Sequence, residues 1–125
     1  MLVACLVFAG VRAASVYLHE LSHSAVALLY RLQPQIHLRL GGSSCTTVPG
    51  AAAAGSGAVA VIRHSGWVFS LLLAIAATYA CTSVAMVAAL WLTALDAISS
   101  DALGWTPRSH RVRVCCNAIP LTWEL

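Results

Sequence analysis

Lysine is absent from this chain and acidic residues are scarce: all seven basic residues are arginine, and only four residues are Asp or Glu. Charged residues make up 9% of the 125 positions, whereas a soluble globular domain carries about a quarter. Together with a hydrophobic fraction of 60%, this excludes an ordinary soluble domain and indicates an integral, multi-pass membrane protein. The length suits one domain over residues 1–125.

Regularly spaced cysteines and long basic runs are also missing. Five cysteines without a C-x-x-C spacing form neither a disulfide framework nor a zinc-finger pattern. The only basic cluster is Arg108, Arg111 and Arg113, within a basic tail over residues 106–125. Such a cluster suits an anionic lipid surface better than nucleic acid. We therefore expect the lipid bilayer, and no nucleic acid, as a partner.

Long apolar segments make up much of the sequence, and the first covers residues 1–30. A helix over residues 2–30 would be about 43 Å long, more than the hydrocarbon core of about 30 Å. Either this helix tilts strongly, or Arg12 marks a membrane interface and residues 13–30 alone span the bilayer. Residues 1–14 could also be a signal peptide, but they lack a basic start. We favour a single membrane segment.

A second apolar run, residues 66–98, follows later in the chain. As one helix, residues 67–98 would be about 48 Å long, so two helices with a tight turn near 78–83 fit better. Residues 51–62 are rich in Ala and Gly and fit a loop, a re-entrant segment or a short interfacial helix. The expected fold is mainly α, with about three transmembrane helices.

Residues 35–49 have a different pattern, which predicts a short β-hairpin between the first and second helices. Residues 35–40 alternate between polar and apolar side chains, as a half-buried strand does. Gly41 and Gly42 then supply a turn, and a second β-favouring segment ends at Pro49. His37 on this hairpin is expected to be an exposed strand residue rather than a ligand.

The segment from His19 to His23 has the H-E-x-x-H pattern of a helical zinc site. On a helix these two histidines lie about 40° apart around the axis, so both imidazoles can reach one metal ion. Glu20 is about 100° from His19, poorly placed as a third ligand but well placed to deprotonate a metal-bound water. Pairing of His with Glu could occur without metal, but three ionisable residues in so apolar a helix favour a Zn²⁺ site.

A catalytic zinc needs a third protein ligand. Beyond Glu20, the acidic residues are Asp96, Asp101 and Glu124. Asp96 and Asp101 close the last apolar segment, and a helical hairpin could bring either of them back to the first helix. Alternatively, each could be only a helix-end residue that binds no metal. These residues alone leave the third ligand open.

Together, these features resemble the site-2 protease family of intramembrane zinc metalloproteases. His19–Ala25 matches the H-E-x-x-H segment of that family, and Leu40-Gly41-Gly42 is similar to its hairpin glycines. Residues 65–74 are similar to its small-residue-led helix, and Ile98–Ala102 looks like its Asp motif. The resemblance implies that Asp101 is the third metal ligand beside His19 and His23. It also implies a membrane-embedded, metalloprotease-like domain.

The function implied by this resemblance is an intramembrane zinc metalloendopeptidase that cleaves transmembrane segments of membrane proteins. Glu20 would be the catalytic base, and the hairpin, with Gly41 and Gly42 assigned to substrate binding, could hold an extended substrate by strand addition. The alternative is a catalytically degenerate, metal-stapled structural or interaction subunit of a membrane complex; a metal-handling membrane protein is a weaker third. The intact Glu20 favours the enzyme. Ala102, where the family usually has Gly, favours the alternative.

Overall fold

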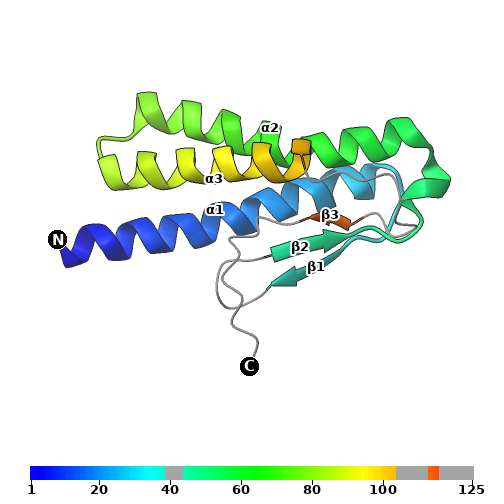
Figure 1. Cartoon of the computed structure of the whole chain (residues 1–125), viewed down its shortest axis with the longest axis horizontal. Coiled ribbons are helices and arrows are strands. Elements are labelled where there is room, and N and C mark those ends of the chain that lie inside the picture. The colour runs from blue at the N-terminus through cyan, green and yellow to red at the C-terminus, as the bar shows by residue number, and fades with distance from the viewer. Residues whose placement is uncertain (39–43, 104–112, 116–125) are drawn as a thin grey trace.

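The computed structural model describes residues 1–38, 44–103 and 113–115 (Figure 1). Its helices are α1 (Leu2–Leu29), α2 (Ser56–Ala80) and α3 (Val84–Leu103), with a 3-10 turn, η1 (Ala51–Ala54), ahead of α2. The three α-helices lie side by side, and each contacts the other two. Each is long and apolar enough to span a membrane. The predicted fold, mainly α with three such helices and a hairpin between the first two, is confirmed.

Small side chains line the contacts between the helices. Six buried residues of α2, with Val59 buried beside them, recur about every fourth position: Ala58, Ile62, Gly66, Ser70, Ala74 and Ala77. Apolar helices gain no hydrophobic free energy by leaving lipid, so close backbone packing and polar contacts must hold them together. The row along α2 provides that close packing, and three of its members, Ile62, Gly66 and Ser70, also contact the candidate site.

Helix α2 starts earlier than the second apolar run, which begins at residue 66. The helix begins at Ser56 and continues to Ala80, so residues 51–62 are divided between η1 and α2. Arg63 does not interrupt the helix, because its guanidinium donates a hydrogen bond to the backbone carbonyl of Asp101 on α3. The connection to α3 lies at residues 81–83, within the predicted turn.

A small antiparallel sheet lies alongside the C-terminal half of α1 (Figure 1). Strand β1 (Gln35–Leu38) pairs with β2 (Ser44–Thr47), and β2 also pairs with β3 (Arg113–Cys115). This third strand, from the predicted basic tail, was not expected. Gly41 and Gly42, assigned to substrate binding, lie outside the described residues, and so do Arg108 and Arg111 of the basic cluster.

Arg12 of α1 forms an ion pair with Asp96 of α3. One turn along, the hydroxyls of Ser15 and Thr93 lie 2.6 Å apart. Helix α1 continues unbroken past Arg12. We call these four residues the polar seam. Their contacts help to set the position of α3 along α1.

We expect Asp96→Asn to destabilise the bundle by about 3 kcal/mol, because it leaves the Arg12 charge without its partner inside the helix contact. Thermal unfolding in detergent, followed by circular dichroism, measures the change. The double variant Arg12→Gln/Asp96→Asn removes both charges and should recover most of the loss. A double variant no more stable than Asp96→Asn would show that the ion pair does not set the stability of the helix contact.

Candidate metal centre

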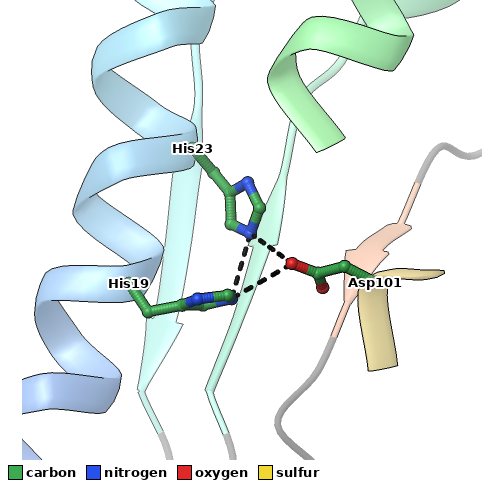
Figure 2. Close-up of side chains that lie close together, drawn as sticks. All are labelled: His19, His23 and Asp101. Atoms are coloured by element: carbon green, nitrogen blue, oxygen red, sulfur yellow. Dashed lines mark hydrogen bonds and ion pairs between the residues drawn. The ribbon is translucent and has the colours of Figure 1, made fainter. Parts of the chain in front are cut away.

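Three side chains from two helices converge in the interior of the bundle (Figure 2). His19 and His23 extend from one face of α1, and Asp101 reaches them from the end of α3. All three are at most 3% exposed. The Nε2 atoms of the two histidines are 3.1 Å apart, and Oδ2 of Asp101 lies 3.6 Å from each of them. The structure thus brings together the residues that the resemblance implied as ligands.

The spacing of these three atoms suits one metal ion. Ligand atoms about 2.0–2.1 Å from a tetrahedral zinc lie about 3.3 Å from one another, close to the separations found here. Among the described residues, Oδ2 of Asp101 is buried without a hydrogen-bond partner, which is costly for a carboxylate oxygen unless a cation compensates it. His19, His23 and Asp101 could therefore hold a metal ion.

The second ring nitrogen of each histidine is held by α2. Nδ1 of His23 lies 2.7 Å from the carbonyl oxygen of Ile62. Since a carbonyl only accepts, Nδ1 carries the proton, and the Nε2 of a neutral His23 presents its lone pair to the cluster. Nδ1 of His19 is 3.0 Å from the hydroxyl of Ser70. Such outer contacts orient metal-binding imidazoles and set their tautomers.

Gly66 lets α2 approach the imidazoles this closely. A Cβ atom built at this position would overlap ring atoms of both His19 and His23. Gly66 has no unusual backbone conformation, so close approach, and not backbone freedom, requires glycine here. Any larger residue must move α2 or the histidine rings, and with them the ligand atoms.

Asp101, and not Asp96, is the carboxylate beside the histidines. Asp96 faces Arg12 in the polar seam. Oδ1 of Asp101 accepts a hydrogen bond from Ser100 at 3.3 Å, which leaves Oδ2 directed at the imidazoles. Arg63 holds the Asp101 backbone. The register of α3 against α1 thus places Asp101 rather than Asp96 beside the histidines.

Glu20 is fully buried but stands apart from the three converging atoms. Its carboxylate turns to β2, where Ser44 donates to Oε1 at 3.1 Å and Thr46 donates to Oε2 at 2.6 Å. In the sequence of α1 it directly follows His19. Glu20 therefore borders the site without being one of its ligand candidates, as the helical geometry indicated.

Sequence reasoning missed the residues that surround the cluster. Ser44 and Thr46 were predicted only as part of a β-favouring segment, and Gly66 and Ser70 only as part of the segment similar to the small-residue-led helix of site-2 proteases. A signal was available for both pairs, because positions two apart share a strand face and positions four apart share a helix face. His37 and His64 are exposed and form hydrogen bonds with Thr47 and Trp67, respectively. The exposure of His37 agrees with its expected place on the hairpin outside the site.

No protein-family model, curated protein or solved structure matches this chain. The resemblance to site-2 proteases therefore stays a prediction from the sequence motifs.

We expect Gly66→Ala to weaken metal binding about 10- to 100-fold, the usual range when ligand orientation is lost. Zinc retained after dialysis against a graded chelator, measured by elemental analysis, gives the affinity. Gly57→Ala is the matched control: it lies on the same helix, but its added methyl meets nothing within 4 Å. Equal zinc affinity in the two variants would show that Gly66 does not set the ligand positions.

Proposed function

We propose that this chain is an intramembrane zinc metalloendopeptidase of site-2 type, acting on transmembrane segments of membrane proteins. The observation that carries the proposal is the convergence of His19, His23 and Asp101 at ligand spacing, with the buried carboxylate of Glu20 beside them. Three protein ligands are typical of catalytic zinc, whereas structural zinc sites have four.

Zinc suits this set of donors, and the H-E-x-x-H pattern favours it over Fe²⁺, which also binds two histidines and one carboxylate. Two neutral imidazole nitrogens and one carboxylate oxygen form a borderline ligand set that zinc accepts readily, and Ca²⁺ and Mg²⁺ prefer oxygen alone. When bound, zinc would act as a Lewis acid that polarises a peptide carbonyl and makes water a stronger nucleophile at neutral pH.

The residues of the chain would divide the remaining work. Glu20 would accept the proton that water loses as its oxygen forms a bond to the peptide carbonyl carbon. When the C–N bond breaks, Glu20 would return a proton to the leaving amine, which leaves the enzyme unchanged. Ile62 and Ser70 would hold the imidazoles, and Arg63 would hold the backbone of Asp101.

The substrate would have to be unwound near the site, because an intact transmembrane helix keeps its carbonyls in its own hydrogen bonds. An extended segment could add to the sheet as a strand. Since β2 is paired on both sides within the described sheet, the outer edge of β1 is the simplest place. The assignment of Gly41 and Gly42 to substrate binding stays a prediction.

One observation favours the alternative, a metal-stapled structural or interaction subunit. Both carboxylate oxygens of Glu20 already accept hydrogen bonds from β2, so this carboxylate could serve only to dock the strand on α1. The two experiments below separate these functions.

We expect Glu20→Gln to reduce cleavage of a transmembrane substrate by about 10²- to 10⁴-fold, the usual contribution of a general base, because an amide cannot take the proton. Zinc should remain at about one per chain, since Glu20 is not among the ligands. His23→Ala provides the contrast and should lose both zinc and cleavage. Unchanged cleavage in Glu20→Gln would remove Glu20 from the mechanism.

A structural site would need a fourth protein ligand, and His37, His64 and Cys45 are the candidates. We expect the triple Ala variant of these residues to keep its zinc and to bind a hydroxamate, because none of the three belongs to the cluster of described ligand atoms. Zinc content and competition with a labelled hydroxamate are the measurements. Loss of zinc from the triple variant would favour the structural role.

A further inference from the structure

The hairpin contacts the site through two hydroxyl groups. Ser44 and Thr46 are two positions apart on β2, so their side chains leave the same face of the strand. That face is turned to α1, and both residues are buried, at 4% and 0% exposure. They are the described side chains that donate hydrogen bonds to the Glu20 carboxylate, one to each oxygen.

Thr46 makes the stronger of these contacts. Its Oγ1 lies 2.6 Å from Oε2 of Glu20 and 3.3 Å from the backbone oxygen of the same residue. A hydroxyl has a single proton, so the shorter contact takes it. Hydrogen bonds to an ionised carboxylate are among the stronger ones in proteins. The position of Glu20 therefore depends on β2 and not on α1 alone.

The sheet in turn holds β2 in place. Thr46 pairs with Ile36 of β1 on one side and with Val114 of β3 on the other. A glutamate side chain has three rotatable bonds, and donors fixed to a strand paired on both sides limit its orientation. A carboxylate has about four lone-pair sites, so two bonds from β2 leave capacity to accept a proton from water.

We propose that Ser44 and Thr46 are positioning residues for Glu20, so that β2 aims the general base at the reacting water. This inference rests on the proposed protease function and assigns the hairpin a second task beside substrate binding. The two hydroxyls act through Glu20 and neither binds metal nor contacts substrate. Their loss should therefore lower kcat while KM and zinc content stay unchanged.

The test compares Thr46→Val with Thr46→Ser. Valine has the shape of threonine without the hydroxyl, whereas serine keeps the hydroxyl and loses the methyl group. We expect kcat to fall about 10- to 100-fold in Thr46→Val, the size of a lost hydrogen bond to a charged group, and to recover in Thr46→Ser. Ser44→Ala should show a smaller fall, and it serves as the test if Thr46→Val does not fold.

A second readout does not depend on activity. The chain has two glutamates, Glu20 and Glu124, so ¹³C-carboxyl glutamate labelling gives two carboxyl signals, and Glu20→Gln identifies the one from Glu20. We expect this signal to shift in Thr46→Val and to return toward its wild-type position in Thr46→Ser. Zinc-loaded protein is used for every variant.

The outcomes separate the two proposals. A Glu20 signal unmoved by Thr46→Val and Ser44→Ala would overturn the inference, whatever the activity. Unchanged kcat in these variants, when Glu20→Gln is inactive, would overturn the inference and leave the protease function standing. Zinc-loaded wild-type protein that cleaves no transmembrane substrate would overturn both. A shifted signal with a lower kcat, unchanged KM and rescue by Thr46→Ser supports the positioning role.

Discussion

The arrangement of this bundle depends on the burial of four ionisable side chains, His19, Glu20, His23 and Asp101, inside three apolar helices. A buried polar atom without a partner is costly, and a buried charge without one is costlier still. Within the described residues, serine and threonine hydroxyls form hydrogen bonds with the Glu20 oxygens, with Nδ1 of His19 and with Oδ1 of Asp101. The carbonyl of Ile62 accepts a hydrogen bond from Nδ1 of His23. The atoms left over are the two Nε2 atoms and Oδ2, and they face one another. A cation at that point would give all three buried atoms a partner.

The bundle also depends on close packing of α2 against α1. This packing is needed because the hydrogen-bond partners of the two buried histidines lie on α2. The Ile62 carbonyl and the Ser70 hydroxyl reach the imidazoles only because Gly66 between them lets the helix lie against the rings. These residues belong to one row with a spacing of four, so a single helix face provides both the packing and the partners of the histidines. Helix association and the geometry of the site therefore have the same cause.

Local patterns in the sequence predicted what depends on neighbouring residues. The spacing of His19 and His23, the three apolar helices and the hairpin all follow from periodicity along short segments. The choice between Asp96 and Asp101 depends on the register of α3 against α1, which the distant Arg12–Asp96 pair helps to set. The contact of β2 with Glu20 likewise joins residues 26 positions apart. Neither contact follows from periodicity, because each depends on how separate elements pack.

Glu20 is what distinguishes a catalytic reading of this site from a purely structural one. A metal held by His19, His23 and Asp101 would bridge α1 and α3, and it would stabilise the bundle whether or not any reaction took place. Glu20 adds nothing to that bridge, and its carboxylate is fully buried, which is costly for a charged group. The two hydroxyls on β2 offset part of this cost, but an apolar residue at position 20 would avoid it entirely. A buried carboxylate next to a three-ligand site is what the proposed proton transfer requires.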